Sequence, residues 1–176
     1  EYGVAPVRLG INLAAEQIQQ HDFVAKFSEL LDELKIDPAL LEIEITEGTM
    51  VRDLSSTQEK LSALSALGIK IAIDDFGMGY SSLSYLRTLP IHAIKIDRSF
   101  IADIKPDSDN TLVNAMMLIG KGLGLRLIAE GVETQEQLAF LKANGCDECQ
   151  GYFISKPLNG EEVTRLLASG RRLLAE

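Results

Sequence analysis

The chain of 176 residues is 46% hydrophobic and 24% charged, which is typical of one soluble globular domain with a sizeable core. Its formal net charge of −9 argues against binding a nucleic acid polymer through a broad basic face. The sequence has no apolar run near the ~20 residues that cross a bilayer, and its start, Glu1-Tyr2-Gly3, resembles neither a signal peptide nor an initiation site. We therefore expect a cytoplasmic chain excised from a longer protein, whose upstream segments can still carry a membrane anchor.

Hydrophobic patterning predicts six strands, each followed by a helix. The strands are expected at 7–11, 41–46, 69–73, 93–96, 125–129 and 146–149. Apolar residues at helical spacing, capping boxes and glycine stops predict helices around 23–34, 61–67, 82–86, 110–123, 134–141 and 159–167. The fold class is therefore α/β.

Strands that alternate with helices through short loops imply a parallel sheet with right-handed crossovers. Such a sheet is either an open doubly wound sheet, which forms its site at one crevice, or a closed (β/α) barrel, in which all strand ends meet at one mouth. Polar residues end most of the strands here, and this ring of contributing strands favours a TIM-like (β/α) barrel. Because such a barrel has eight strands and typically about 250 residues, we expect an incomplete barrel with about six of the eight units.

The stretch from Asp74 to Ser82 reads Asp-Asp-Phe-Gly-Met-Gly-Tyr-Ser-Ser and directly follows the apolar run 69–73. Two adjacent carboxylates at the end of a buried strand repel each other and are costly to desolvate unless a cation lies between them. Gly77 and Gly79 leave the backbone free to approach a ligand closely. The alternative, which stays open for an isolated Asp-Asp pair, is a solvated turn whose aspartates cap the next helix.

Other strands end in the same kind of residue, and this recurrence favours one binding site over separate turns. The residues at the strand ends are Asn12, Glu44 with Glu47, Asp74 with Asp75, Lys95 with Asp97, Glu130 with Glu133, and Gln150. Carboxylates and carboxamides are the oxygen ligands of Mg²⁺ and Mn²⁺, whereas zinc favours clustered His or Cys. Two metal ions that share Asp74 would neutralise a phosphate and bridge an attacking water, which Lys95 would orient or deprotonate. Taken singly, each residue also has a structural explanation, such as a turn or an exposed strand position.

The two cysteines form a lone C-x-x-C pair, Cys146 and Cys149. A structural zinc site needs a second pair of ligands, and His21 and His92 have no matching spacing. A thioredoxin-type pair would open a helix after a strand, whereas this pair comes just before Gln150. Ordinary packing is the favoured interpretation, and redox or metal chemistry is the alternative.

Six motifs in a fixed order span nearly the whole chain. They are Ile11-Asn12-Leu13, 41–47 (LEIEITE), 74–83 (DDFGMGYSSL), 94–97 (IKID), 129–134 (AEGVET), and 150–152 (QGY) with 156–158 (KPL). The set resembles the EAL domain family of bacterial cyclic di-GMP phosphodiesterases. The resemblance implies a TIM-like barrel with one antiparallel strand, and hydrolysis of cyclic di-GMP to linear pGpG that depends on Mg²⁺ or Mn²⁺, with two ions. It also implies a homodimer and an upstream sensory or GGDEF-type domain in the parent chain.

The resemblance also implies roles for individual residues. The implied metal ligands are Asn12, Glu44, Asp74, Asp75 and Glu130, with Asp75 at the second ion. The implied catalytic groups are Lys95, which holds or deprotonates the water, with Glu130 and Asp75. The residues implied to bind substrate or to support the ligands are Glu47, Asp97, Glu133 and Gln150. The loop Gly77-Met78-Gly79 is expected to be anchored by Glu47 and to couple the metal site to dimerisation.

The chain departs from the family in two places. The Glu-Ala-Leu tripeptide of the family's first strand is absent, so we expect residues 1–176 to be an N-terminally truncated EAL-type domain. Met78 stands where the family usually has threonine, and methionine lacks the hydroxyl that threonine would supply. One alternative function is a catalytically inactive domain that binds cyclic di-GMP as a sensor. Another is an open barrel that neither binds nor cleaves the nucleotide.

Overall fold

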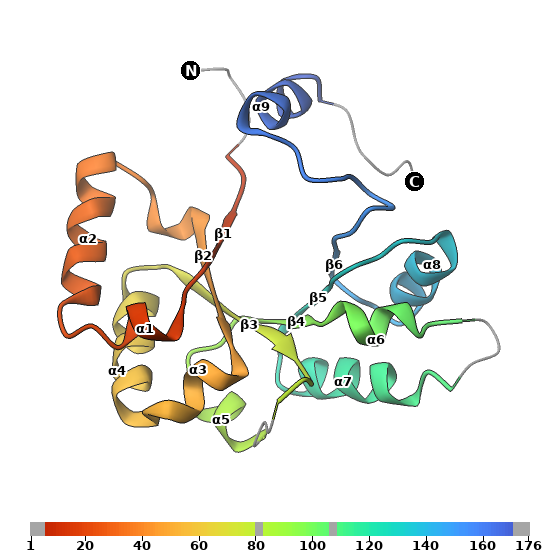
Figure 1. Cartoon of the computed structure of the whole chain (residues 1–176), viewed down its shortest axis with the longest axis horizontal. Coiled ribbons are helices and arrows are strands. Elements are labelled where there is room, and N and C mark those ends of the chain that lie inside the picture. The colour runs from red at the N-terminus through yellow and green to blue at the C-terminus, as the bar shows by residue number, and fades with distance from the viewer. Residues whose placement is uncertain (1–5, 80–82, 106–108, 171–176) are drawn as a thin grey trace.

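The computed structural model describes residues 6–79, 83–105 and 109–170, and its centre is one six-stranded sheet. The strands lie in chain order and each pairs in parallel with the next. They are β1 (Leu9–Asn12), β2 (Leu41–Thr46), β3 (Lys70–Phe76), β4 (Ala93–Ile96), β5 (Arg126–Ala129) and β6 (Glu148–Cys149). Figure 1 shows the sheet curling from β1 at one edge to β6 at the other. A doubly wound sheet reverses its strand order, and this one does not, so it is an incomplete barrel of six strands, as predicted.

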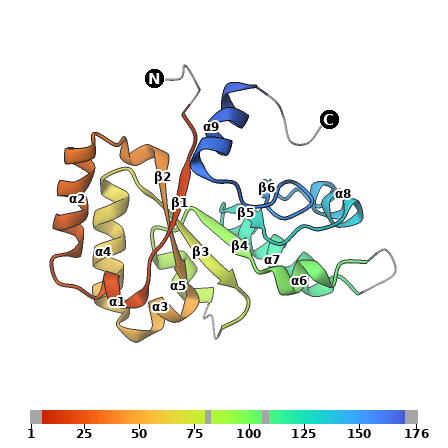
Figure 2. The same ribbon diagram turned by 45° about the horizontal axis from the view of Figure 1, so that its top comes forward.

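Helices follow each strand and supply the crossovers that parallel pairing requires. Those of the first half are α1 (Ala15–Ile18), α2 (Phe23–Leu34), a short 3₁₀ turn (Pro38–Leu40), α3 (Glu47–Arg52), α4 (Leu54–Ala66) and α5 (Leu83–Thr88). Those of the second half are α6 (Arg98–Ala102), α7 (Thr111–Gly122), α8 (Gln135–Ala143) and α9 (Gly160–Ala168). Figures 1 and 2 place α2 and α4 beside the first strands and α7 beside β4 and β5. The same views place α9 apart from these helices, near the N-terminal end of β1.

The main hydrophobic core lies between the outer face of the sheet and the helices. Alternate strand residues such as Ile43, Ile73 and Ile94 are fully buried there against helix residues such as Leu64 and Met117. Burying each of these side chains stabilises the fold by about 1.5–3 kcal/mol. The intervening residues face the other way, because side chains alternate along a strand. That concave face therefore carries the polar residues of the strands, with a small cluster of Ala72, Ala93 and Ile128 between them.

Short elements and strand ends differ from the sequence-based expectation. The helices α1, α3 and α6 were not predicted, because four to six residues are too few to show a helical period. The strand predicted at 69–73 continues to Phe76, so Asp74 and Asp75 belong to β3 itself. The pairing of β3 with β4 shifts register between Ile73 and Phe76, which is typical of a β-bulge.

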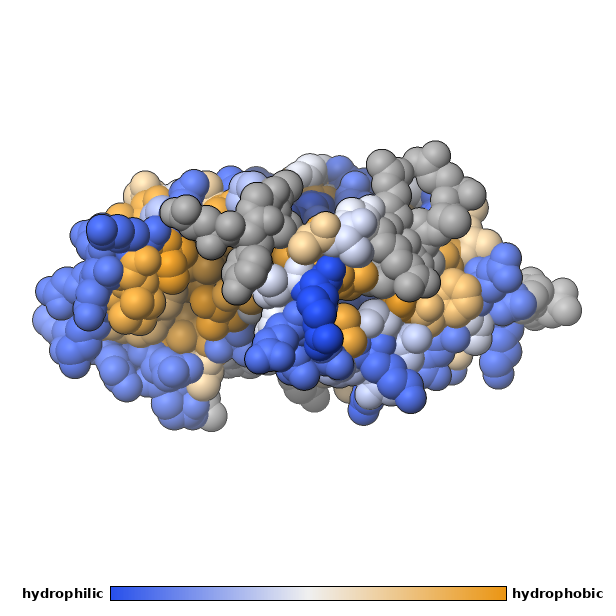
Figure 3. Space-filling model, turned by 90° about the horizontal axis from the view of Figure 1, so that it is seen from above, coloured by the Kyte–Doolittle hydropathy of each residue, from blue (hydrophilic) through white to orange (hydrophobic). Residues whose placement is uncertain are grey.

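Two surface features complete the fold. Among the described residues, no helix combines the length and the apolar content that a bilayer crossing needs. Figure 3 shows apolar side chains gathered at the α2 end of the molecule, framed by hydrophilic ones. The exposed apolar residues of α2, of the turn after it and of the chain around β1 are Val7, Leu9, Leu30, Leu34 and Ile36. The edge of the sheet at β1 is therefore flanked by apolar surface.

Candidate functional site

Lys95 on β4 lies at the centre of the polar cluster on the concave face. Its side chain is only 6% exposed, and its Nζ atom contacts three carboxylates that come from three other strands. The distances are 2.5 Å to Glu44 Oε2, 2.7 Å to Glu130 Oε1 and 3.1 Å to Asp74 Oδ1. Burial disfavours the charge of Lys95, but hydrogen bonds to Glu130 and Glu44 outweigh it and raise the pKa of Lys95 above its ordinary value. The lysine therefore stays protonated at neutral pH and acts as a cation that ties the strand ends together.

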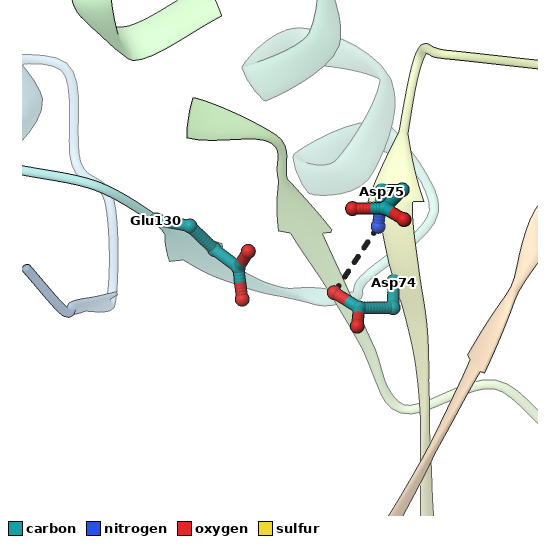
Figure 4. A group of neighbouring side chains, drawn as sticks. All are labelled: Asp74, Asp75 and Glu130. Carbon is teal, nitrogen blue, oxygen red and sulfur yellow. Dashed lines mark hydrogen bonds between the residues drawn. The ribbon is translucent and has the colours of Figure 1, made fainter. Parts of the chain in front are cut away.

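Asp74, Asp75 and Glu130 form the group of carboxylates best placed to hold a metal ion. One oxygen of each lies within 4.8 Å of the others, and Figure 4 shows Glu130 pointing from β5 toward the two aspartates of β3. The N–H of Asp75 donates to Asp74 Oδ1 at 3.1 Å. Asp75 has a φ of 52°, a left-handed conformation that is uncommon outside glycine. This conformation, at the register shift of β3, turns consecutive carboxylates toward the same side.

The negative charge of this group is incompletely balanced. Burial, and then the nearby charges of Asp74 and Asp97, raise the pKa of Asp75 above its ordinary value. Burial also raises the pKa of Glu130, although the contact with Lys95 opposes the shift. Both raised pKa values indicate that additional positive charge nearby would stabilise the ionised carboxylates.

Gln150, directly after β6, supports Glu130. Its Nε2 donates to Glu130 Oε1 at 2.7 Å, the same oxygen that Lys95 contacts. Its backbone N–H donates to the Ala129 carbonyl at 2.8 Å, which continues the pairing of β5 and β6. Gly151 then passes so close to Val132 that a Cβ at this position would lie 2.2 Å from the Val132 carbonyl oxygen. This approach fixes the backbone next to Gln150.

Glu47 at the start of α3 holds the loop that follows Asp75. It is buried, and its Oε1 accepts the N–H of Gly77 at 3.0 Å. A Cβ on Gly79 would lie 2.4 Å from Glu47 Oε2, and that oxygen has no hydrogen-bond partner among the described residues. Met78 is 62% exposed, and its sulfur lies 3.5 Å from the Ser99 hydroxyl. The rest of the predicted loop, 80–82, lies outside the described residues.

Three predicted site residues take more peripheral places. Asn12 is exposed at the end of β1 and pairs in register with Glu44. Asp97 caps α6, since its Oδ1 accepts the Ser99 N–H at 2.9 Å. Glu133 is exposed and lines a cavity beside Glu130. The structure thus brings the lysine, the acidic strand ends and Gln150 together, and it leaves Asn12 and Glu133 at the margin.

The sequence interpretation missed the basic residues of this cavity. The cavity has a volume of about 440 Å³ and adjoins the acidic group through Glu130 and Gln150. Arg98 at the start of α6 and Lys156 after β6 contribute positive charge to its lining, and Tyr152 contributes an aromatic ring. Lys156 stands in one of the quoted motifs, but nothing in the local sequence indicates that Arg98 lies beside it.

A second group of charges was also missed, at the opposite ends of the strands. Arg126 at the start of β5 contacts Glu42 of β2, and its NH1 lies 2.6 Å from Glu148 Oε1 of β6. Arg8 lies 3.7 Å from the same Glu148 oxygen. The only sequence feature that pointed to these ion pairs was the mixture of apolar and acidic residues in 41–46. These ion pairs cross the concave face and tie β2, β5 and β6 together away from the candidate site.

The fold and the site together define an α/β barrel-type domain whose acidic strand ends converge around a lysine, a donor set suited to divalent cations. The EAL domain family model matches residues 3–157, and the chain belongs to this family. Two curated relatives from Pseudomonas aeruginosa are similar in sequence to most of this chain. The bifunctional diguanylate cyclase/cyclic di-GMP phosphodiesterase MucR is 41% identical over 167 residues, covering 94% of this chain and 24% of MucR. The cyclic di-GMP phosphodiesterase NbdA is 40% identical over 153 residues, covering 86% of this chain and 20% of NbdA.

Solved structures confirm the TIM-like fold class. The EAL domain of Mycobacterium smegmatis DcpA matches with a TM-score of 0.88 and 39% identity, over 93% of this chain and 74% of that one. The cyclic di-GMP complex of the MucR phosphodiesterase matches with a TM-score of 0.84 and 40% identity, over 89% of this chain and 64% of that one. A manganese and cyclic di-GMP complex of Klebsiella pneumoniae BlrP1 matches with a TM-score of 0.77 and 33% identity, over 85% of this chain and 39% of that one. The chain spans about a quarter of the length of the curated relatives it matches.

Proposed function

We propose that residues 1–176 form the greater part of a metal-dependent domain that hydrolyses cyclic di-GMP to linear pGpG. The observation that carries the proposal is the contact of one buried lysine with three carboxylates from separate strands, beside the unbalanced pair of Asp74 and Asp75. The phosphodiesterase names of the relatives support the same reaction class. Two further strands beside β1 and β6 would close the barrel around this site.

Mg²⁺ or Mn²⁺ fits the residues that are present. The donor set is all oxygen, and three of its carboxylates already lie within the spacing that one ion bridges. The residues proposed to hold two ions are Asn12, Glu44, Asp74, Asp75 and Glu130. When bound, such ions would neutralise a phosphodiester and lower the pKa of a water molecule. A manganese complex of the relative BlrP1 supports this choice of metals.

The chain's own residues have distinct tasks in this proposal. Lys95 stays protonated and uses its three N–H donors to hold Glu44, Asp74 and Glu130 at fixed positions. It would hold the attacking water by releasing one of these carboxylates, rather than by removing the proton of the water. Glu130, whose pKa is raised by burial, is then the better acceptor for that proton. Gln150 fixes the orientation of the Glu130 carboxylate through its 2.7 Å hydrogen bond.

The neighbouring residues position the substrate and the loop. The cavity beside Glu130 would take one guanosine half of the nucleotide, with Arg98 and Lys156 near its phosphate and Tyr152 against its base. Glu47 anchors Gly77 in the loop that carries Met78, and Asp97 sets the start of the helix that carries Arg98. Glu133 lines the same cavity.

The family resemblance also suggests the other domains, the location and the oligomeric state of the parent protein. We propose that the parent protein joins this domain to an upstream sensory or GGDEF-type domain, acts in the cytoplasm and forms a homodimer through the loop near Glu47. The cyclase named in the relative MucR supports the GGDEF-type partner. A domain that binds cyclic di-GMP without cleaving it is the second candidate, and Met78 favours it because it lacks the hydroxyl of the threonine that the family usually has at this loop position.

Chromatography of the products that the full parent protein forms from cyclic di-GMP tests the proposal. We expect pGpG with Mn²⁺ or Mg²⁺ and none with a chelator, and we expect Glu44→Gln to abolish it. Glu136→Gln, at an exposed position on α8, is the matched control and should keep full turnover. Calorimetric binding of cyclic di-GMP without any product would establish the sensor instead, and retained turnover in Glu44→Gln would refute the assigned site.

A further inference from the structure

Cys146 and Cys149 are the only cysteines of the chain, and both are free thiols that are partly buried. Cys149 ends β6 and Cys146 lies two residues before this strand, and both pack against the main hydrophobic core. The intervening Glu148 points to the other face of the sheet, where it pairs with Arg126. The two thiols therefore share one apolar side of the strand.

The backbone bends at Asp147, between the two cysteines, and the bend brings the Cys146 sulfur close to the chain next to Cys149. Asp147 Oδ2 accepts the Leu127 N–H at 2.8 Å, which holds the bend between the cysteines. Cys146 Sγ lies 3.2 Å from the carbonyl oxygen of Glu148, the residue directly before Cys149. The Cys146 sulfur therefore already lies beside the backbone that leads into Cys149.

The two thiols differ in their surroundings. The neighbouring Cys146 thiol lowers the pKa of Cys149 against the effect of burial, and Lys142 in the last turn of α8 acts in the same direction. For Cys146, the neighbouring Cys149 thiol, burial and the nearby Asp147 raise the pKa. Cys149 is therefore the better nucleophile of the pair, because the thiolate is the reactive form.

A metal site is a poorer explanation of this pair. Structural zinc needs four ligands. Within the part of the chain that the structure describes, the only grouping of three His, Cys, Asp or Glu ligand atoms is Asp74, Asp75 and Glu130, which excludes both cysteines. The two acids between the cysteines are already paired, Asp147 with the Leu127 N–H and Glu148 with Arg126.

We propose that Cys146 and Cys149 are a redox-active thiol pair that a peroxide converts to an intrachain disulfide. The Cys149 thiolate attacks one oxygen of hydrogen peroxide, and the other oxygen leaves as hydroxide and takes a proton to become water. The resulting sulfenic acid is attacked by the Cys146 sulfur, which forms the S–S bond and releases a second water. The two thiols lose two electrons, and the peroxide gains them. Since Gln150 follows Cys149 directly, this modification lies at the base of the strand segment that supports Glu130.

Alkylation and mass spectrometry of the purified chain test the proposal without any need for phosphodiesterase activity. The reduced chain should take up two alkylating groups. After treatment with hydrogen peroxide it should take up none, and dithiothreitol should restore both. Trypsin should release both cysteines in one peptide, 143–165, with the mass of an internal disulfide.

Single variants separate the two steps. In Cys146→Ser, peroxide should leave a sulfenic acid on Cys149 that dimedone traps, and in Cys149→Ser the Cys146 thiol should remain open to alkylation. Persistence of both thiols after peroxide, or a disulfide between two chains instead of within one, would overturn the proposal. Protection of both reduced thiols by Zn²⁺ alone would overturn it in favour of a metal site.

Discussion

Replacing Lys95 with methionine removes the one positive charge at the centre of the acidic cluster while keeping the length of the side chain. The three carboxylates that contact its Nζ atom would remain, with side chains only 13%, 14% and 16% exposed. Breaking a buried ion pair from one side destabilises a protein by about 3–5 kcal/mol, because the other charge is left unpaired in a poorly solvated place. We therefore expect Lys95→Met to lower the free energy of unfolding by about that amount.

Urea unfolding near neutral pH, followed by circular dichroism with a chelator present, measures this change. The chelator matters because a bound cation would replace the missing ammonium. Adding Mn²⁺ should therefore recover more stability in Lys95→Met than in the unmodified chain. Lys26→Met, which breaks an exposed helical pair with Asp22, is the matched control and should have no measurable effect.

A second substitution distinguishes charge from packing. If the loss comes from unpaired carboxylates, then Lys95→Met combined with Glu130→Gln should be more stable than Lys95→Met alone, since one of the three charges is gone. If the loss of stability comes from packing, the destabilisation by Glu130→Gln should add to that by Lys95→Met. A loss below about 1 kcal/mol, the range of an exposed ion pair, would refute the view that Lys95 holds the strand ends together.

Two other positions allow similar tests. The Ile71 N–H donates to His92 Nδ1 at 3.2 Å, and burial and then Lys70 hold the pKa of His92 below its ordinary value. The folded chain therefore binds this proton less readily than the unfolded chain, so the free energy of unfolding should fall as pH drops through about 6.5. His92→Asn keeps an acceptor but does not titrate. An equal fall in its free energy of unfolding, measured with urea, would contradict this explanation. Gly77 has a φ of +98°, and a Cβ there would lie 2.2 Å from Met116 Cε, so Gly77→Ala should lower the thermal midpoint by an amount equivalent to about 1–3 kcal/mol. Gly122→Ala, a helical position with open space, should raise the midpoint instead, and equal effects of the two alanines would exclude the clash.

Much of the site could be predicted because strand ends are visible in a sequence. The apolar runs before Asp74 and Glu130 and the alternating apolar residues around Glu44 mark strands, and parallel pairing places the ends of such strands at one edge. The candidate ligands therefore follow from pattern and topology alone. What the pattern does not contain is register, and register decides that Lys95 contacts Glu44, Asp74 and Glu130 at once.

The parts that could not be predicted depend on contacts distant in sequence or on very short elements. Arg98 enters the cavity because α6 begins directly after Asp97, and a five-residue helix has no detectable period. The left-handed conformation of Asp75 has no sequence signal either, since aspartate rarely adopts it. The pair of Arg126 and Glu42 lies 84 positions apart in sequence.

Charge counting favours two metal ions over one in the proposed site. Glu44, Asp74, Asp75 and Glu130 carry four negative charges when ionised, and Lys95 returns one positive charge, which leaves a formal charge of −3. One divalent cation would reduce this to −1, which still repels a phosphodiester. A second cation would bring it to +1, which attracts one. The raised pKa values of Asp75 and Glu130 have the same origin in part, because in each the nearby charge of Asp74 adds to the effect of burial. The lysine can organise the carboxylates, but it cannot by itself make their surroundings attractive to an anionic substrate.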